Sequence, residues 1–590
     1  MKYPEVWDLD SIFKGGSHSE EFAHFVKETD RLLGELADSI GEEVTLDQLE
    51  QHIHSVQQLM QRTRQASAFV SCLTAQNVKD KEATLWQGKM TEQATKIQNI
   101  WGTIEDFLGE LDANQWENLV SRPSLSGVTF NLEERRLQAK EKLSPNEEKL
   151  AAELAIDGYH AWGNVYNSAV GRMQIPFEEN GQEKLLSAGQ LQNRLNSSDR
   201  SVRERAEIVS EKAWEKEADL FASTLNHLAG FRLNLYHARG WGDVLKEPLA
   251  INRMKKETLD AMWSTITENK PKFYEFMTRK AQLLGVEKLA MHDVHAPLPV
   301  EGDTSISYED ACDLIIKHFQ PFSPKLASFT EGALRDGWVE AEDRAGKRPG
   351  GFCTSFPLSK QSRIFMTYDG TMANVATLAH ELGHAYHGHC LKDMDPLAQR
   401  YAMNVAETAS TFAETIIADA LVKEAPTEEV KLSLLENKIS RSLAFFMNIH
   451  ARFLFETRFY EARKEKLLSV EELNSLMEDA QKEAYGNQLA TYSPTFWASK
   501  LHFHITGVPF YNFPYTFGFL FSLGIYKKAL EAGRSFEDDY IALLQDTASM
   551  TVEDLASKHL NVDLTKKDFW QEAIDLILVD VDEFMELTNS

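Results

Sequence analysis

The chain has 590 residues, of which 43% are hydrophobic and 26% are charged. A chain of this length and composition can bury a sizeable core, which can be divided between two or more subdomains. Its 62 lysine and arginine residues are outnumbered by 90 aspartates and glutamates, so the formal net charge is −28. Such a charge disfavours binding to nucleic acid or to an anionic membrane surface.

The cysteines and the first residues predict a cellular compartment. The four cysteines are widely spaced and form no Cys-x-x-Cys pair, so neither a disulfide framework nor a thiolate metal site is indicated: Cys72, Cys312, Cys353 and Cys390. The segment Met1 to Trp7 lacks the apolar core of a signal peptide. No segment approaches the roughly 18 apolar residues of a membrane-spanning helix. We therefore expect a protein of the reduced cytoplasm, with its cysteines buried as small apolar residues.

Helical patterns dominate from the N-terminus onwards and predict a mainly α fold. A first helix is expected to open near Ser17 or Ser19. Its apolar positions recur at helical spacing: Phe22, Phe25, Val26, Leu32, Leu33, Leu36 and Ile40. Proline and glycine residues predict breaks at 123–127, 175–181, 297–302 and 344–351. We place a boundary near residue 190, between an N-terminal helical subdomain (1–190) and a second domain (191–590) that carries the motifs described next.

Two short strands are predicted immediately before the most informative motif. Residues 350–356 and 363–368 can form a small β-sheet, and Asp369-Gly370 predicts a turn after it. A helix should follow, capped by Thr371 or Asn374. Its buried face is predicted from apolar residues at helical spacing: Val375, Leu378, Leu382 and Ala385.

This helix contains His380-Glu381-Leu382-Gly383-His384, an H-E-x-x-H string. Two histidines four residues apart lie one turn apart on the same helix face, so both imidazoles can bind one zinc ion. Glu381 projects about a quarter turn away, which places its carboxylate beside the open coordination position as a general base. Gly383 should cost about 1 kcal/mol relative to alanine. It is either a tolerated weak point or, as we favour, a site of close approach by another helix.

A catalytic zinc ion usually needs a third protein ligand. His387 lies on the same face, but residues 380 and 387 are about 10 Å apart along a straight helix, so we reject it. Glu407 is the better candidate, on a second helix predicted to begin after Pro396. Ser410 and Glu414 share its polar face and can orient a ligand imidazole by hydrogen bonding. The alternative is that this face is simply solvated.

A third segment, near the C-terminus, is rich in histidine and aromatic residues. Gly507, Pro509 and Pro514 predict a loop between a short extended piece and a helix starting near Thr516. Hydrolysis of a peptide bond needs donors aimed at the oxyanion that forms in the transition state. The candidates for this role are His502, His504, Tyr511 and Tyr515. The alternative is a buried aromatic cluster with locally satisfied polar groups.

Three segments together resemble the oligoendopeptidase F branch of the thimet oligopeptidase family of zinc metallopeptidases. They are Thr377-Leu-Ala-His-Glu-Leu-Gly-His-Ala-Tyr-His387, Val405-Ala-Glu-Thr-Ala-Ser-Thr-Phe-Ala-Glu414, and His502-Phe with Phe510-Tyr-Asn-Phe-Pro-Tyr-Thr-Phe-Gly518. Weaker similarities extend the resemblance over most of the chain, at Trp7-Asp-Leu-Asp10, Ser198-Asp-Arg-Ser-Val-Arg203 and Ala296-Pro-Leu298.

The resemblance implies a role for each of these residues. His380, His384 and Glu407 would bind one zinc ion, and Glu381 would activate water. His502, followed by Tyr511 and Tyr515, fits the order of the family's transition-state residues. This chain departs from the pattern, because relatives often have His-Phe-Tyr where it has His502-Phe503-His504. The resemblance also implies a multi-helix, zincin-type peptidase fold that encloses a deep substrate channel, with access limited to short unfolded peptides.

The sequence therefore predicts a cytoplasmic zinc endopeptidase that hydrolyses internal bonds of oligopeptides. The edge of the small sheet can pair with an extended peptide through main-chain hydrogen bonds, although a covered edge is the alternative. A helical zinc metallocarboxypeptidase is a second candidate, and it would refuse peptides with an amidated C-terminus. A non-catalytic peptide-binding helical protein is a third. The sequence does not indicate cleavage preference or oligomeric state.

Overall fold

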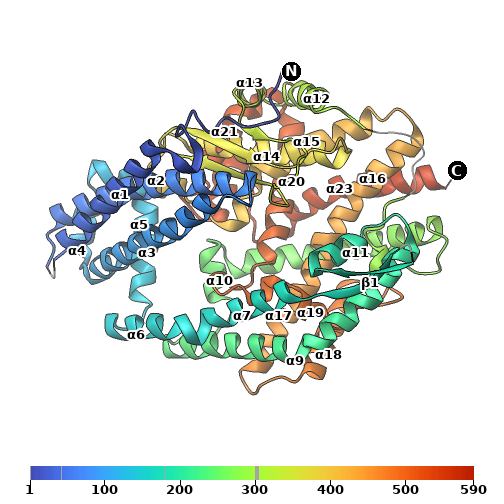
Figure 1. Ribbon diagram of the computed structural model, residues 1–590, viewed down its shortest axis with the longest axis horizontal. Helices are drawn as coiled ribbons and strands as arrows, with labels where there is room; N and C mark the ends of the chain where they lie inside the picture. The colour runs from blue at the N-terminus through green and yellow to red at the C-terminus, as the bar shows by residue number, and fades with distance from the viewer. Residues whose placement is uncertain (1, 42, 180, 299–304, 590) are drawn as a thin grey trace. The chain divides into compact units, whose positions relative to one another are not determined.

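The computed structural model describes residues 2–41, 43–179, 181–298 and 305–589. The predicted mainly α fold is confirmed, and strands form only two small sheets in these residues (Figure 1). The predicted break at 297–302 lies partly outside the described residues. No helix among those described is both long and apolar enough to cross a membrane.

The chain forms two compact units, and each is built from segments distant in sequence. Unit 1 consists of Met1–Lys142, Asp303–Ala420 and Ile525–Asn561, and unit 2 of Leu143–Gly302, Leu421–Gly524 and Val562–Ser590. The predicted boundary near residue 190 coincides with none of these crossing points and stays a prediction.

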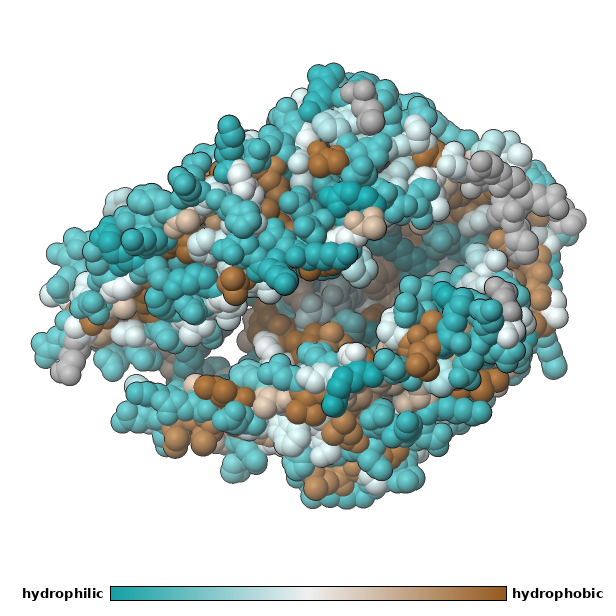
Figure 2. Space-filling view, viewed as in Figure 1, coloured by the Kyte–Doolittle hydropathy of each residue, from teal (hydrophilic) through white to brown (hydrophobic). Residues whose placement is uncertain are grey.

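Unit 1 begins with long antiparallel helices, drawn in blue in Figure 1. The described helices at its N-terminal end are α1 (Glu20–Ser39), α2 (Leu46–Gln76), α3 (Lys81–Glu110), α4 (Ala113–Val120) and α5 (Thr129–Lys140). Helix α1 starts as predicted, because the side chain of Ser19 accepts a hydrogen bond from the backbone N–H of Phe22. Ile53, Ile104 and Leu132 form a shared core of these helices. Their outer surface is mostly hydrophilic, as Figure 2 shows at its left side.

The other elements of unit 1 hold the H-E-x-x-H segment. They are α12 (Tyr308–Phe319), α13 (Pro324–Arg335), β3 (Val339–Glu340), β4 (Phe352–Phe356), β5 (Gln361–Phe365), α14 (Met372–Leu391), most of α15 (Thr408–Lys423), the end of α20 (Phe513–Ala532), α21 (Phe536–Asp546) and α22 (Val552–Leu560). The cysteines behave as expected: all four are free, and only Cys353 is not fully buried.

The predicted small sheet is present in unit 1, with strand order β3-β5-β4. Strands β4 and β5 are antiparallel, with Phe352 opposite Phe365, and β3 runs parallel to β5. Trp7 packs on this sheet at ring-centroid distances of 6.4 Å from Phe352 and 5.7 Å from Phe365. The buried guanidinium of Arg363 donates to the backbone oxygen of Asp8. These contacts explain why the N-terminal Trp-Asp-Leu-Asp segment accompanies the sheet.

Helix α14 begins as the sequence predicts. The Oγ1 atom of Thr371 accepts a hydrogen bond from the backbone N–H of Asn374, and the Asn374 side chain accepts one from the N–H of Asp369. All four residues of the predicted apolar stripe have no exposed surface: Val375, Leu378, Leu382 and Ala385. This stripe holds α14 in the core and leaves the motif face directed elsewhere.

The second helix of the motif region differs from the prediction. It does not begin after Pro396, where the chain instead forms the 3₁₀ turns Pro396–Gln399 and Met403–Val405. Between these turns Ala402 has extended backbone angles, so a continuous helix is impossible. Helix α15 begins at Thr408, and the carbonyl oxygen of Glu407 accepts its first hydrogen bond, from the N–H of Thr411. Glu407 is therefore the residue that caps α15 and does not lie on its face.

Gly383 is a site of close approach, as we favoured. A Cβ atom at this position would lie 2.5 Å from the carbonyl oxygen of Ala409 and 2.6 Å from the Cα atom of Ser410. Both neighbours are backbone atoms of the first turn of α15, which cannot move aside as the end of a flexible side chain can. Helices α14 and α15 thus contact each other at Gly383, the residue before His384.

Unit 2 is a second helical body. Its described elements are α6 (Pro145–Ala155), α7 (Ala161–Arg172), β1 (Ile175–Glu179), β2 (Gln182–Leu186), α8 (Ala188–Arg194), α9 (Arg200–Ala238), α10 (Lys246–Ile251), α11 (Lys256–Leu283), α16 (Glu428–Leu443), α17 (Ile449–Arg463), α18 (Val470–Ala484), α19 (Phe496–Ser499), the start of α20, and α23 (Lys567–Thr588). The predicted break at 175–181 is the hairpin β1-β2.

A buried ion cluster explains the Ser198-to-Arg203 segment of unit 2. Asp293 is fully buried, and it pairs with Arg200 and Arg203, each with a closest N–O distance of 3.0 Å. Arg203 also donates to the backbone oxygens of Ser197 and Ser198. The two arginines hold the start of α9 against the segment that precedes residue 299.

We predict that Gly383→Ala destabilises unit 1 by about 1–3 kcal/mol, because the new methyl group overlaps the backbone of α15. Chemical unfolding monitored by circular dichroism measures this free energy. Gly102→Ala is the matched control: it also lies within a helix of unit 1, but no heavy atom comes within 4 Å of the added Cβ atom. The control should gain up to about 1 kcal/mol in helix propensity. Equal effects of the two substitutions would contradict the close approach.

Candidate active site

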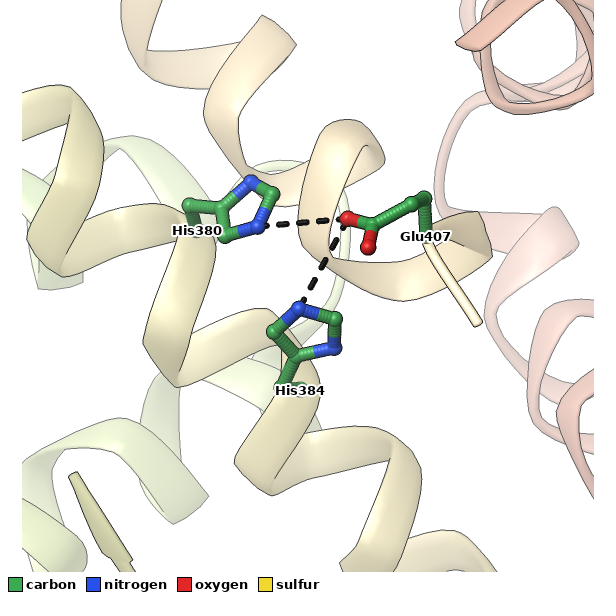
Figure 3. Close-up of side chains that lie close together, drawn as sticks. All are labelled: His380, His384 and Glu407. Carbon is green, nitrogen blue, oxygen red and sulfur yellow. Dashed lines mark ion pairs between the residues drawn. The ribbon is translucent and has the colours of Figure 1, made fainter. Parts of the chain in front are cut away.

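Three of the residues selected from the sequence come together in unit 1. His380 and His384 point from α14 toward the carboxylate of Glu407, as Figure 3 shows. Each of the three offers a ligand atom, and these atoms lie within 4.8 Å of one another. The Oε2 atom of Glu407 is 3.2 Å from Nε2 of His380 and 3.6 Å from Nε2 of His384.

These distances fit a tetrahedral metal ion. Ligands roughly 2.0–2.2 Å from a tetrahedral zinc ion are separated from each other by about 3.3–3.6 Å. The two nitrogen-to-oxygen distances fall close to this range without any rearrangement of the helices. About a fifth of each side chain is exposed, so the three donors also leave one side open to a further ligand.

The hydrogen bonds around His380 favour a cation between it and Glu407. The Nδ1 atom of His380 is 3.0 Å from Oε2 of Glu414, and a carboxylate can only accept there. In the neutral imidazole the proton is then on Nδ1, and Nε2 presents a lone pair to the Glu407 carboxylate. Two acceptors facing each other repel unless a cation lies between them. The donor set therefore fits the metal that the sequence predicts.

Glu407 and His384 are held in the protonation states that metal binding requires. Burial alone would raise the pKa of Glu407, but the two neighbouring histidines and the Ser410 hydroxyl lower it to about 2. The Oγ of Ser410 donates to Oε2 of Glu407 at 2.8 Å. Burial lowers the pKa of His384 to about 4, against the opposing effect of Glu407. The carboxylate is thus ionised and the imidazole neutral near pH 7.

Glu381 lies beside this group without belonging to it. Its side chain is buried, and among the described residues no donor contacts its Oε2 atom. Burial raises the pKa of this carboxyl to about 7, opposed by His380 and reinforced by Glu407. A Cβ atom on Gly351, which precedes strand β4, would lie 3.4 Å from its Oε1 atom. The carboxyl group therefore lies between the metal ligands and the edge strand of the small sheet.

His387 has a structural environment, in agreement with its rejection as a ligand. It is fully buried, and its ring stacks on Tyr401 at a centroid distance of 4.2 Å. Its Nε2 atom is 2.9 Å from Oγ1 of Thr547. Burial lowers its pKa to about 3, so the ring stays neutral.

The candidates for oxyanion stabilisation lie in unit 2, where His502, Tyr511 and Tyr515 are neighbours. The ring of Tyr511 has centroid distances of 5.3 Å to His502 and 5.8 Å to Tyr515.

The segment that carries these residues differs from the predicted loop at both ends. Residues Leu501–His504 form a 3₁₀ turn in place of an extended piece, and α20 already begins at Phe513. Pro514 did not delay the helix, because the first turn of a helix needs no proline N–H.

The two histidines of this segment have different environments. His504 is almost fully buried, and its ring stacks on Tyr166 at a centroid distance of 3.8 Å. Its Nδ1 atom is 3.4 Å from Oγ1 of Thr224, and burial lowers its pKa to about 3. His502 is partly exposed beside Tyr511. His502 is therefore the more accessible member of the pair.

Sequence reasoning missed the residues of unit 2 that contact His502. The guanidinium of Arg452 on α17 lies 3.4 Å from Nδ1 of His502 and 3.0 Å from Oδ1 of Asn512. Arg452 precedes His502 by 50 residues and lies in a helix rich in phenylalanine. It is one of three arginines in this helix, and no sequence signal distinguishes it from a surface charge.

Known proteins resemble the chain over nearly its full length. Residues 194–576 match the family described as Peptidase family M3, and residues 108–175 match the one described as Oligopeptidase F. Oligopeptidase PepF of Bacillus subtilis (strain 168) is 24% identical, and the alignment covers 100% of this chain and 88% of the relative.

Solved structures share the fold. A protein from Chlamydophila abortus superposes with a TM-score of 0.82 at 20% identity, covering 99% of this chain and 98% of the other. Oligoendopeptidase-F from Enterococcus faecium superposes with a TM-score of 0.70 at 20% identity, covering 96% of this chain and 99% of the other. Because the family model matches more than half of its residues, the chain belongs to peptidase family M3.

Proposed function

We propose that this M3-family peptidase is a zinc endopeptidase that hydrolyses internal bonds of short peptides. The observation that carries the proposal is the spacing of the His380, His384 and Glu407 ligand atoms, with the Glu381 carboxyl group beside them. Two histidines and a glutamate are a ligand set of catalytic zinc sites that keep one open position. One zinc ion per chain is expected, and peptides are the substrates.

Each residue then has a defined task. His380, His384 and Glu407 hold the zinc ion, while Glu414 and Ser410 orient His380 and Glu407. When bound, zinc supplies a Lewis acid that acidifies water. Glu381 takes the proton of the attacking water and later delivers it to the leaving amine, a role that suits a carboxyl group with a pKa near 7.

Two further parts of the proposal concern the substrate. His502, Tyr511 and Tyr515 donate hydrogen bonds to the oxyanion that forms at the scissile carbonyl. Strand β4 has only β5 as a partner among the described strands, and its residues Phe352 to Ser355 are half-buried. Its free edge is suited to pair with an extended peptide main chain, which would make side-chain selectivity modest. A cytoplasmic location stays part of the proposal.

We predict that Glu381→Gln abolishes cleavage of an internally quenched peptide blocked at both ends, while zinc content stays near one per chain. The amide cannot accept the proton, but it is not a metal ligand. Fluorescence and metal analysis of the same samples measure both quantities. Glu331→Gln is the control, since this partly exposed residue forms an ion pair with Arg335 one turn further along α13. Chelation of the metal should also stop cleavage, and added zinc should restore it.

The outcomes separate the alternatives. If wild type trims free peptides but leaves blocked ones intact, the chain is a carboxypeptidase. If Glu381→Gln loses zinc together with activity, Glu381 has a structural part in the metal site. If the variant cleaves as wild type does, the general-base role is wrong.

We predict that His502→Phe lowers kcat by roughly 10²–10³-fold, the usual effect of removing one oxyanion donor. His504→Phe is the matched control two residues away. A phenyl ring can keep the stack on Tyr166, so kcat should change less than about threefold. Steady-state kinetics on the blocked peptide compare the two. The reverse order of effects would assign the role to His504.

We predict that Glu414→Ala weakens zinc affinity about 10- to 100-fold, because His380 loses the acceptor that fixes its tautomer. Glu414→Gln should weaken zinc affinity less, since its amide oxygen can still accept a hydrogen bond from Nδ1 of His380. Competition with a zinc-binding dye measures both variants. An alanine variant with the affinity of wild type would show that Glu414 does not orient the ligand.

A further inference from the structure

One face of α17, continued by the helical turn before it, contacts the segment from His502 to Thr516. A short π-helix, Ala444–Asn448, precedes α17, and such turns often occur at functional sites. The residues of this face are three or four positions apart, so they share one side of the helix. Four of them contact the segment, namely Phe445 through its carbonyl oxygen, Arg452, Glu456 and Tyr460, while Asn448 contacts Arg452. All of them, like the segment, belong to unit 2.

Arg452 is the centre of this face. Its Nε atom donates to Oδ1 of Asn448 at 2.8 Å, which fixes the guanidinium plane. Its Nη1 atom is 3.0 Å from Oδ1 of Asn512 and 3.4 Å from Nδ1 of His502. The guanidinium also lies over the ring of Phe496, 5.3 Å from its centroid. Burial lowers the pKa of Arg452 only to about 10, so the side chain is a permanent cation near pH 7.

The contact with Arg452 selects one tautomer of His502. A guanidinium has donors and no acceptor, so Nδ1 of His502 can face it only with a lone pair. The proton of the neutral imidazole is then on Nε2. Burial, together with the charges of Arg452 and Lys500, lowers the pKa of His502 to about 4, which keeps the ring neutral. His502 thus presents a single N–H donor on the side away from α17.

The same face also fixes the backbone on both sides of Tyr511. The N–H of Phe510 donates to Oε1 of Glu456 at 3.2 Å, and Phe510 has a φ of 52°, which a bulky residue rarely adopts. On the other side, Asn512 is bound by Arg452. The Oγ1 of Thr516 donates to the carbonyl oxygen of Phe445 at 3.0 Å. Tyr511 therefore projects from a backbone held at the residues before and after it.

We propose that Arg452 is a positioning residue, which presents His502 to the oxyanion as an Nε2–H donor and aligns Tyr511 through Asn512. The inference deepens the proposed function and rests on the donor role of His502. Arg452 itself does not touch the substrate. It determines which nitrogen of His502 carries the proton, and it orients the His502 and Tyr511 side chains as donors.

Kinetics of Arg452→Met test the proposal. We expect kcat on the blocked peptide to fall about 10- to 100-fold with a smaller change in KM, because misaligned donors weaken the transition state more than substrate binding. Arg452→Lys should recover part of the loss, since an ammonium is also a donor without acceptors. Arg458→Met is the matched control on the same helix. Arg458 forms an ion pair with Glu483 and not with the segment from His502 to Thr516, so the kcat of this variant should equal that of wild type.

A double-mutant cycle distinguishes positioning from mere stabilisation. If Arg452 acts through His502, Arg452→Met should lower kcat much less in the His502→Phe background than in wild type. Full additivity of the two losses would overturn the proposal. The proposal would also be overturned if Arg452→Lys lowered kcat as much as Arg452→Met does, or if the Arg458→Met control lowered it equally.

The tautomer gives a readout that does not depend on activity. In protein labelled with ¹⁵N-histidine, the imidazole signals of His502 are identified by their disappearance in His502→Phe. We expect wild type to show an unprotonated Nδ1 and a protonated Nε2, and Arg452→Lys to keep this pattern. A protonated Nδ1 in wild type would overturn the inference. If the tautomer is as expected but His502→Phe retains full kcat, the proposed donor role of His502 fails, and the positioning role of Arg452 with it.

Discussion

The close approach of α14 and α15 at Gly383 is the constraint on which the proposed metal site depends. With no side chain at residue 383, the backbone of Ala409 and Ser410 can lie against α14. This contact brings Glu407, the cap of α15, within 3.6 Å of both ligand nitrogens. Glu414, two turns further along α15, then reaches the opposite nitrogen of His380. One glycine thus positions both a candidate metal ligand and the group that would orient another.

The parts of this arrangement that the sequence could predict are those encoded by local spacing. The Thr371 cap, the apolar stripe of α14 and the separation of His380 and His384 follow from helical geometry alone. Glu407 could be selected because it lies one short loop beyond the H-E-x-x-H helix, and the family resemblance implied the same residue. The predicted start of α15, after Pro396, is wrong. The apolar pattern already includes Val405, but the extended backbone at Ala402 prevents a helix there, and α15 begins only at Thr408. A hydrophobic pattern does not distinguish a 3₁₀ turn from the first turn of an α-helix.

In unit 2 the limits of prediction have a different cause. Gly507 and Pro509 correctly indicated an irregular segment, and the family order implied the roles that we propose for His502 and Tyr511. What orients these side chains is a set of buried polar contacts from α17, about 50 residues earlier. Contacts of this kind depend on tertiary packing. Phe510 has a positive φ, and its backbone N–H is held by Glu456. Residue preferences alone would predict glycine at such a position, so the sequence does not reveal this conformation.

The distribution of charge explains why the metal and the fold of unit 1 should depend on each other. His380 lies between the carboxylates of Glu407 and Glu414, and the carboxyl group of Glu381 is buried nearby. Acceptors placed so close together in a partly buried site repel one another, and a cation bound between them would offset this cost. A bound ion that the unfolded chain cannot hold would stabilise the fold by about 2.7 kcal/mol at a free concentration one hundred times its Kd. The same repulsion between these ligand atoms would therefore favour the binding of the proposed metal ion.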